Sequence, residues 1–348
     1  MATRNIKTWM AELPDEILLS LLSIPGTHNS AACYKALPSV RCQKVSVSTQ
    51  LEHGIRFIDL RTSRSVIALC SHTLVIVHGS FPVSLRRRVL LDSVLNEIYQ
   101  FLDTHSSETV VLSVKHEGPY SQDKYELAEI LWNEYIVPNK DKWWVVNGKM
   151  PSLGEARGKI VLFRRFACHQ SNVYGFPATS WPYNTTGNYS PTLAIQDMCD
   201  ILTPSLIPAK ADFIRRHLVL ASTSSSESTL FVNFTTASNF WDYRCWPKRV
   251  AKAIYPDLVA GVENVTGRCG IVVMDFAESD GWSIVKKIVN KNQVNYFFRI
   301  VRVFVLVLVL VLCVLCVEIR PVLCVLCVLL IDPTLTVLVG LDATDFEI

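Results

Sequence analysis

The sequence lacks the features that would place it in several common classes of protein. No G-x-G-x-x-G follows the first apolar run and no P-loop occurs, so the usual signatures of nucleotide-binding folds are missing. The first residues, MATRNIKTWMAELPDE, lack the apolar core of a signal peptide. The 11 cysteines form no evident disulfide framework. The formal net charge of +3 is too small to argue for a nucleic-acid partner.

What the sequence does contain is an alternation of strand-like and helix-like segments over most of its length. Short apolar runs predict strands at 21–24, 54–62, 73–79, 109–115, 159–166, 229–235 and 270–277. Apolar residues at helical spacing predict a helix at 90–102 and, less cleanly, helices at 124–135, 194–218 and 247–260. This alternation predicts an α/β fold with residues 1–296 in a single (β/α) barrel domain, and a doubly wound open sheet is the alternative.

Side chains able to do chemistry follow nearly every predicted strand. In chain order they are His28, Asp59, Arg61, His78, Lys115, Arg165 and Asp275. Any one of them alone is more simply explained as a solvated loop charge. Their shared position favours a site, because a barrel keeps its active site at the C-terminal edge of its strands.

The residue types at these strand ends suit acid–base chemistry on an anionic substrate. An imidazole can accept a proton in one step and donate one in another, so one of His28 and His78 could act as a general base and the other as a general acid. Arginine binds a phosphate with two parallel hydrogen bonds. An aspartate bonded to a histidine would fix its tautomer. The set predicts phosphoryl transfer without a metal ion.

Eight segments in series also carry a resemblance to a known family. They are SIPGTHNSA, LEHGIRFIDLRTSR, IVHGS, FLDTHSSETVVLSVKHE, LGEARGKIVLFRRF, IQD, LFVNFTTAS and GIVVMDFAE. Together they resemble the catalytic X domain of phosphatidylinositol-specific phospholipases C, of the small bacterial kind also found in fungi. The resemblance implies a distorted TIM-type barrel that releases diacylglycerol and inositol 1,2-cyclic phosphate from phosphatidylinositol or its glycosylated relatives.

The resemblance implies roles for individual catalytic residues. His28 would be the general base and Asp275 its orienting partner, while His78 would be the general acid. Arg61 would support the phosphate in the transition state, and Asp59 would belong to the polar network of the same floor.

The resemblance implies a substrate site as well, with two departures from the family pattern. Lys115, Arg165 and Asp197 would hold the inositol hydroxyls. Asn29, grouped here with the substrate-binding residues, stands where the bacterial pattern has an aspartate that assists the general acid. Cys199 stands where the family has a tyrosine that stacks under the inositol ring. These departures keep open a second hypothesis, a catalytically decayed barrel that binds inositol lipids without cleaving them.

The resemblance also bears on cofactors and partners. Arg61 and Lys115 occupy strand ends where the calcium-dependent eukaryotic branch has acidic ligands, so we expect no metal and no other cofactor. A metal-dependent glycerophosphodiesterase, a third hypothesis, lacks the clustered carboxylates that its metal would need. We expect a monomer that meets a phosphatidylinositol-type lipid at a membrane surface and is cytoplasmic or peripheral to that membrane. Arg86, Arg87 and Arg88 form either a solvated basic loop or a contact with anionic lipid.

The end of the chain, residues 297–348, differs from the rest and is expected to be a separate low-complexity tail. It is rich in Val, Leu and Cys, and the heptapeptide VLCVLCV occurs at 311–317 and again at 322–328. The apolar run at 303–317 is shorter than the ~20 residues of a membrane-spanning helix. The spacing of Cys313, Cys316, Cys324 and Cys327 permits a zinc site but lacks the usual turn residues. The duplication favours a third interpretation, the translation of a nucleotide repeat outside the evolved domain.

Overall fold

The computed structural model describes residues 5–65, 72–118, 123–170, 172–179 and 183–292. Contacts divide the chain into two units, Met1–Asn292 and Gln293–Ile348. The tail expected from residue 297 lies outside the described residues, so the boundary at 296 and the three interpretations of the tail stay predictions. Within the described part of the chain, no helix is both long enough and apolar enough to cross a membrane.

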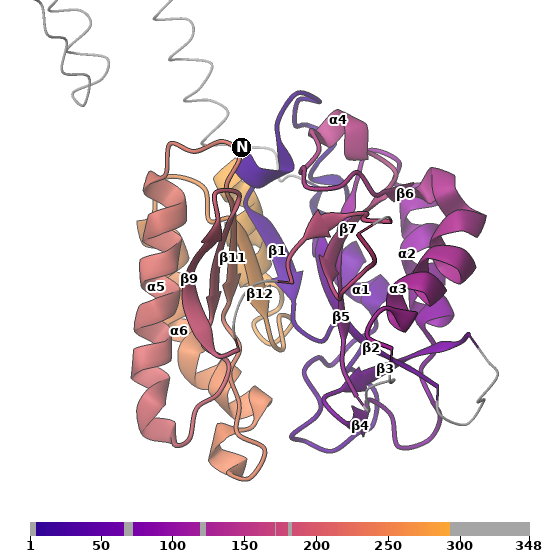
Figure 1. The fold of residues 1–348 in the computed structure, drawn as a ribbon. Helices are drawn as coiled ribbons and strands as arrows, with labels where there is room; N and C mark the ends of the chain where they lie inside the picture. Colours follow the sequence, from indigo (N-terminus) through magenta and orange to yellow (C-terminus); the bar gives the residue numbers. More distant parts are fainter. Residues whose placement is uncertain (1–4, 66–71, 119–122, 171, 180–182, 293–348) are drawn as a thin grey trace, which may run out of the picture. The chain divides into compact units, whose positions relative to one another are not determined.

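One curled sheet forms the centre of the first unit (Figure 1). Its strands are hydrogen-bonded in the order β6-β7-β5-β2-β1-β12-β11-β10-β9. Neighbours from β6 to β10 run parallel, and only the last strand of the path, β9, is antiparallel to its neighbour. The predicted distorted TIM-type barrel is confirmed, although among the described strands no pairing joins β9 back to β6.

The twelve strands have the following bounds: β1 Ile24–Thr27, β2 Phe57–Arg64, β3 Leu74–His78, β4 Phe81–Pro82, β5 Val110–His116, β6 Trp143–Trp144, β7 Ile160–Arg165, β8 Phe176–Pro177, β9 Thr185–Ser190, β10 Leu193–Asp197, β11 Leu230–Phe234 and β12 Ile271–Met274. The parallel strands are buried along nearly their whole length, as strands covered on both faces should be. Each predicted strand exists, with shifts of a few residues at its ends.

Helices cover the outside of the curled sheet. They are α1 Val47–Glu52, α2 Leu91–Thr104, α3 Glu126–Ile130, α4 Leu153–Ala156, α5 Ile207–Thr223 and α6 Pro247–Asn264. Figure 1 shows α5 and α6 side by side beyond the β9–β12 part of the sheet, with α2 and α3 at the opposite side of the molecule. A further helical segment, 283–292, ends the described chain.

Two sequence-based expectations about these elements are wrong. The helix predicted from residue 194 is preceded by a strand: Leu193–Asp197 pairs in parallel with β11, and α5 begins only at Ile207. A short buried apolar run carries no period that separates strand from helix. The strand predicted at 73–79 exists as β3 but is not a further parallel strand of the barrel, because it runs antiparallel to β2.

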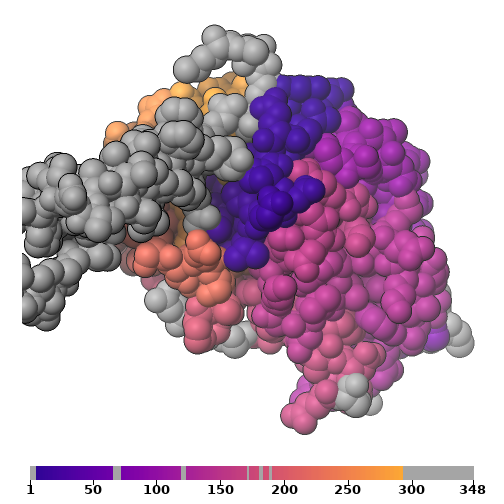
Figure 2. Space-filling model, turned by 90° about the horizontal axis from the view of Figure 1, so that it is seen from above, coloured from indigo at the N-terminus to yellow at the C-terminus, as the bar shows by residue number. Residues whose placement is uncertain are grey.

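The N-terminal residues lie at the end of the barrel where the strands begin. The Trp9 indole donates to the carbonyl oxygen of Gly54, just before β2, and the Met10 amide donates to the Glu108 carboxylate, just before β5. Figure 2, viewed onto this end, shows the N-terminal segment in indigo beside the magenta half of the molecule. Trp9 and Met10 are fully buried, so the start of the chain is part of the core.

Candidate active site

The pair His28 and Asp275 follows from the register of two neighbouring strands. β1 and β12 are parallel with Thr27 opposite Met274, so the next residue of each strand emerges at the same edge. The His28 Nδ1 and the Asp275 Oδ1 are 2.8 Å apart, and both side chains are buried. In the neutral ring Nδ1 then carries the proton, and the second ring nitrogen keeps a lone pair. That nitrogen is able to accept a proton.

His78 reaches the same place by a different route, through the hairpin of β2 and β3. β2 continues past the sheet edge, with Arg64 opposite Leu74, and β3 returns toward the edge and ends at His78. The ring centroids of His28 and His78 are 5.7 Å apart, and the ring planes are nearly perpendicular. The two imidazoles therefore face one small space from opposite elements.

The surroundings of His78 disfavour its charged form. Burial is the largest cause, and the positive charge of Arg61 adds to it, so the pKa of His78 is lowered to about 4. The Nδ1 lies 2.8 Å from the carbonyl oxygen of Val40 and donates to it. The other ring nitrogen carries a proton only when the ring is an imidazolium.

Three cations stand in one row because β2, β5 and β7 are in register. Arg61 lies opposite Lys115, and Lys115 lies opposite Arg165. Two residues before Arg61 and Lys115, on the same face of the sheet, Asp59 lies opposite Ser113. The Ser113 hydroxyl donates a hydrogen bond of 2.9 Å to the Asp59 carboxylate. The pattern of charge is fixed by strand pairing and not by loops.

Asp59 holds two of these cations from below. Its carboxylate oxygens lie 3.4 Å from the Arg61 Nε and 3.4 Å from an Arg165 guanidinium nitrogen. Burial alone would raise the pKa of Asp59, but Arg61 and Arg165 outweigh burial and lower it to about 2. The carboxylate is therefore ionised, and it orients both guanidinium groups toward the open edge.

Glu117 is a site residue that the sequence analysis missed. One of its oxygens lies 2.8 Å from Arg61 Nη1 and 2.5 Å from Lys115 Nζ, and the other accepts from the Gly79 amide at 2.9 Å. Burial opposes its charge, but Arg61 and Lys115 hold its pKa well below the usual range. The signal was present in SVKHE, because Lys115 and Glu117 are two residues apart and so share a face of an extended chain.

The remaining predicted site residues divide into one that lines the cavity and one that does not. Asp197, at the end of β10, lies 3.7 Å from the Arg165 guanidinium and lines the cavity. Asn29 is buried and is not part of the cavity lining, and its backbone φ is 43°. Its amide donates to Asp59, while the nitrogen and oxygen of its side chain have no hydrogen-bond partner in the described structure. Its evident local role is to occupy a left-handed turn, which asparagine tolerates.

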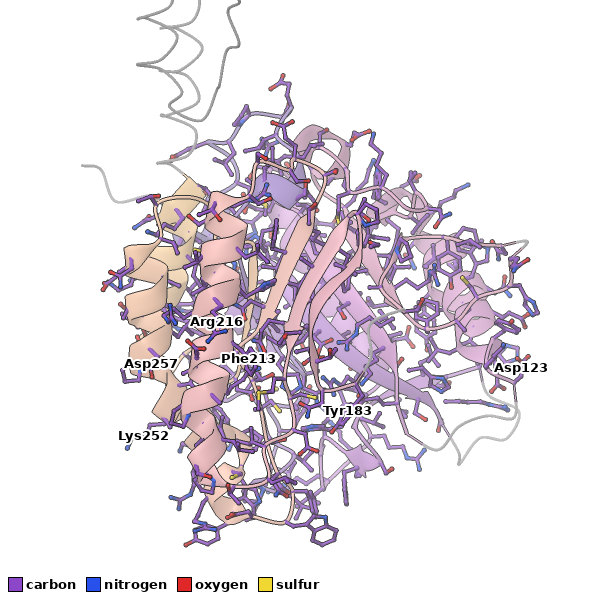
Figure 3. All side chains as sticks on the ribbon, turned by 60° about the vertical axis from the view of Figure 1, so that its left-hand side comes forward. Asp123, Tyr183, Phe213, Arg216, Lys252 and Asp257 are labelled. Carbon is purple, nitrogen blue, oxygen red and sulfur yellow. The ribbon has the colours of Figure 1, made fainter. Side chains whose placement is uncertain are left out.

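The cavity that these side chains line has a volume of about 1120 Å³. Its floor contains both histidines, Asp275 and the row of cations, and its upper wall contains Tyr183, Cys199, Leu202 and Trp241. The Tyr183, Leu202 and Trp241 side chains are 74%, 70% and 90% exposed. Tyr183, labelled in Figure 3, comes two residues before the start of β9. A polar, charged floor under an apolar rim suits a substrate with a polar head and an apolar remainder.

Comparison with known proteins matches this arrangement to a family. Residues 17–166 match the profile of the phosphatidylinositol-specific phospholipase C X domain. The chain is 29% identical to a 1-phosphatidylinositol phosphodiesterase of Listeria monocytogenes, over 83% of this chain and 86% of the relative. It is 25% identical to the enzyme of the same name from Staphylococcus aureus, over 84% of this chain and 96% of the relative.

The chain is therefore similar to the phosphatidylinositol-specific phospholipase C X domain and to the bacterial enzymes that contain it. The solved structure of the phosphatidylinositol-specific phospholipase C from Listeria monocytogenes superposes with a TM-score of 0.64 at 26% identity, covering 82% of this chain and 99% of the other. A structure of the Staphylococcus aureus protein gives a TM-score of 0.69 at 24% identity, with 82% and 97% covered. The X-domain likeness predicted from eight sequence segments is confirmed, and it is of the bacterial type.

Proposed function

We propose that this X-domain protein cleaves phosphatidylinositol or a glycosylated relative into diacylglycerol and inositol 1,2-cyclic phosphate. The observation that carries the proposal is the opposition of His28 and His78, whose ring centroids are 5.7 Å apart at the floor of the cavity. One phosphodiester fits between two imidazoles, one able to take a proton and the other able to give one. The curated relatives bear the name of this activity.

His28 is the proposed base. The ring nitrogen that is not bonded to Asp275 accepts the proton of the inositol 2-hydroxyl as that oxygen attacks phosphorus. The Asp275 carboxylate, 2.8 Å from Nδ1, holds the tautomer and stabilises the imidazolium that forms. The ester bond from phosphorus to the glycerol oxygen breaks, and His78 delivers a proton to that oxygen, which leaves as diacylglycerol.

Arg61 is the proposed support for charge on the phosphate oxygens. Its side chain is only 13% exposed, and Asp59 and Glu117 hold it on either side. The same two carboxylates also hold Lys115 and Arg165 beside Arg61. This cluster of cationic side chains supplies the positive charge that a metal ion would otherwise bring to the phosphate. Lys115, Arg165 and Asp197 are the proposed contacts with the inositol hydroxyls. We expect full turnover in the presence of a chelator.

The rim of the cavity is the proposed contact with the membrane surface. Trp241 and its neighbour Phe240 line the mouth, and Phe240 stacks on Phe81 with ring centroids 4.9 Å apart. Exposed aromatic and aliphatic side chains around a polar site suit an interface between lipid and water. The protein then works peripherally, with its cavity over one lipid head group.

A vesicle assay tests the proposal. Purified protein is mixed with phosphatidylinositol vesicles containing chelator, and inositol 1,2-cyclic phosphate is measured. We expect the product from the native chain and from His72→Ala, which changes an exposed histidine outside the cavity. His28→Ala should lower turnover by at least 10³-fold without loss of vesicle binding. Binding without turnover by the native chain would refute the enzyme and support a lipid-binding module.

A further inference from the structure

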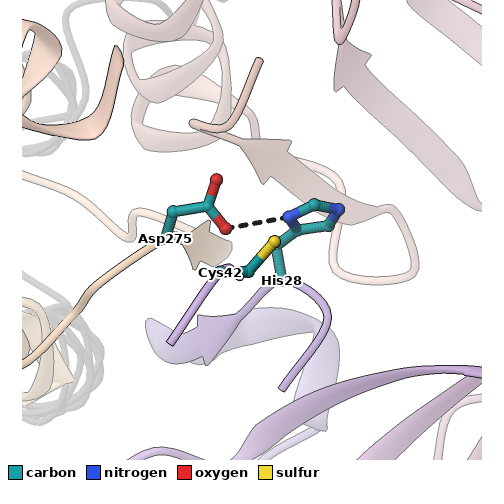
Figure 4. A group of neighbouring side chains, drawn as sticks. All are labelled: His28, Cys42 and Asp275. Carbon is teal, nitrogen blue, oxygen red and sulfur yellow. Dashed lines mark hydrogen bonds and ion pairs between the residues drawn. The ribbon is translucent and has the colours of Figure 1, made fainter. Parts of the chain in front are cut away.

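A buried thiol stands directly beside the His28–Asp275 pair. Cys42 is fully buried, and its sulfur, a ring nitrogen of His28 and a carboxylate oxygen of Asp275 all lie within 4.8 Å of one another (Figure 4). The same sulfur lies 3.7 Å from His78 Nδ1. The sulfur also lies 3.5 Å from the carbonyl oxygen of Val40, to which the thiol donates a weak hydrogen bond. The proposed reaction gives this thiol no task.

Sulfur, imidazole nitrogen and carboxylate oxygen together make a donor set that zinc and cadmium prefer. Around a tetrahedral zinc ion, bonds of about 2.0–2.3 Å place neighbouring ligand atoms roughly 3.3–3.6 Å apart. Because no separation exceeds 4.8 Å, the atoms reach that geometry if the sulfur moves inward by at most about 1.3 Å and the 2.8 Å contact of His28 with Asp275 opens slightly. His28 and Asp275 line the cavity, so an ion has a path to the site and water has access to a fourth position.

We propose that His28, Cys42 and Asp275 form an inhibitory site for a thiophilic divalent cation, Zn²⁺ or Cd²⁺. The ion takes the place of the proton between His28 and Asp275. The thiol gives up its proton to solvent and binds as the thiolate, so one proton is released for each ion bound. The proton of His28 moves from Nδ1 to the other ring nitrogen, which then has no lone pair and cannot act as the base. Ion binding and base catalysis use the same ring of His28, so the protein cannot do both at once.

The proposed site is expected to discriminate against hard cations such as calcium and magnesium. Calcium and magnesium favour oxygen ligands, and here Asp275 offers only one carboxylate beside nitrogen and sulfur. These two ions are expected to leave turnover unchanged at concentrations at which Zn²⁺ stops it. The inhibitory effect on turnover rests on the proposed function, whereas ion binding by the cluster does not.

The test uses the full chain with the four cysteines of the tail replaced by serine, because their paired spacing would bind the same ions. Zn²⁺ and Cd²⁺ are titrated into chelator-free protein, and bound ion per chain, the cadmium–thiolate ultraviolet band and vesicle turnover are recorded. Cys42→Ala and Cys42→Ser are compared with Cys269→Ala, which removes another buried free cysteine. Inhibition is expressed relative to the ion-free rate of each variant.

We expect both Cys42 variants to bind one ion fewer than the background chain and to need at least tenfold more Zn²⁺ for half-inhibition. Cys269→Ala should behave as the background chain does. Two Cys42 variants are made so that a folding defect in one does not decide the result. Unchanged ion binding and unchanged Zn²⁺ sensitivity in a folded Cys42 variant would overturn the proposal. If the chain shows no turnover at all, the loss of one bound ion still reports on the site.

Discussion

His28 and His78 lie in different environments. The surroundings of His28 suit its proposed role as a base, whereas those of His78 disfavour the protonated form that an acid needs. His28 has a carboxylate partner on Nδ1, which supports the positive charge that a base acquires. His78 has no carboxylate on Nδ1, which donates to the Val40 carbonyl oxygen, and the ring is buried beside the positive charge of Arg61. An acid with a pKa of about 4 is mostly deprotonated at neutral pH. Its proton must therefore be stabilised by the substrate.

The depressed pKa of His78 predicts a difference between two pH profiles. In the free protein the protonated fraction of His78 falls tenfold for each pH unit above about 4. A bound phosphodiester places a negative charge beside the ring and raises its pKa. Since kcat/KM reports the free enzyme and kcat the complex, the descending limb of kcat/KM should lie at lower pH than that of kcat. Initial rates over a range of pH and lipid concentrations measure both.

A leaving group that needs no proton supplies the control for that profile. His78→Ala should lose far more rate on phosphatidylinositol than on an inositol phosphodiester of nitrophenol, whose phenolate leaves unprotonated. Descending limbs at the same pH, or equal losses on both substrates, would contradict the assignment of His78 as the acid.

Glu117 predicts a second effect at the scale of one residue. Glu117→Gln removes the charge that holds Arg61 and Lys115 together, so the two cations repel and Arg61 loses its position. We expect kcat to fall by about 10²-fold, the size of effect that a small misplacement of a catalytic group produces. Steady-state kinetics checks this. A change confined to KM would show that Glu117 serves binding and not the placement of Arg61.

The site residues that the sequence predicts best are those whose position is set by a strand. His28, Lys115, Arg165 and Asp275 lie at or just past strand ends, where the sequence analysis expected them. Arg61 lies opposite Lys115 as expected, but β2 continues for three residues beyond it. Glu117 escaped notice because charges in loops are common, and only its two partners show its importance. Asn29 was expected at the site from its place beside His28; its side chain is buried and is not part of the cavity lining, so its role stays a prediction.

At the scale of elements, the two ends of each strand have different tasks. The C-terminal end of β5 carries Lys115, and Arg61 lies opposite it on β2. Just before their N-terminal ends, Arg56 and Glu108 form a fully buried ion pair at 2.9 Å. Arg56 also donates to the carbonyl oxygens of Leu51 and Ile55, so the charge is well compensated. In a barrel, residues at the end where the strands begin contribute to the stability of the fold.

Glu108→Ala is therefore expected to destabilise the fold without changing the chemistry. It leaves the Arg56 guanidinium buried without its countercharge, which costs about 3–5 kcal/mol in the free energy of unfolding. Denaturant unfolding measures that cost, and kcat/KM at a temperature well below the transition should stay native. Glu263→Ala, which removes an exposed ion pair with Lys287, should cost less than about 1 kcal/mol. Equal costs for the two variants would contradict this account of the buried pair.

The elements could be predicted where periodicity or burial is continuous, and not where topology decides. The apolar stripe at 90–102 gave α2 almost to the residue. The antiparallel return of β3 depends on hydrogen bonds between strands, which no local pattern encodes. β10 was hidden because three buried residues of a short strand, Leu193 to Ile195, match the start of a helix equally well.

For the molecule as a whole, the last described residue of the chain is tied to the first barrel strand. The Ser23 amide donates to the Asn292 side-chain oxygen at 2.7 Å, and the Asn292 side-chain nitrogen donates to the Ser23 carbonyl oxygen at 2.9 Å. Both residues are buried. The segment 283–292 is thereby fastened beside the start of β1, which delivers His28 to the site at its other end.

This attachment predicts where the chain can be shortened. Asn292→Ala leaves two buried backbone groups of Ser23 unpaired and should lower the free energy of unfolding by about 2–4 kcal/mol. Asn290→Ala, an exposed change on the same helix, should stay within about 0.5 kcal/mol of the native chain. A chain that ends at Asn292 keeps the attachment and should match the full chain in unfolding midpoint and turnover, whereas one that ends at Ile288 should not. Urea unfolding followed by tryptophan fluorescence, with vesicle turnover on the same samples, measures all four. If the chain ending at Asn292 unfolds at markedly lower urea than the full chain, the unit that carries the site extends beyond Asn292.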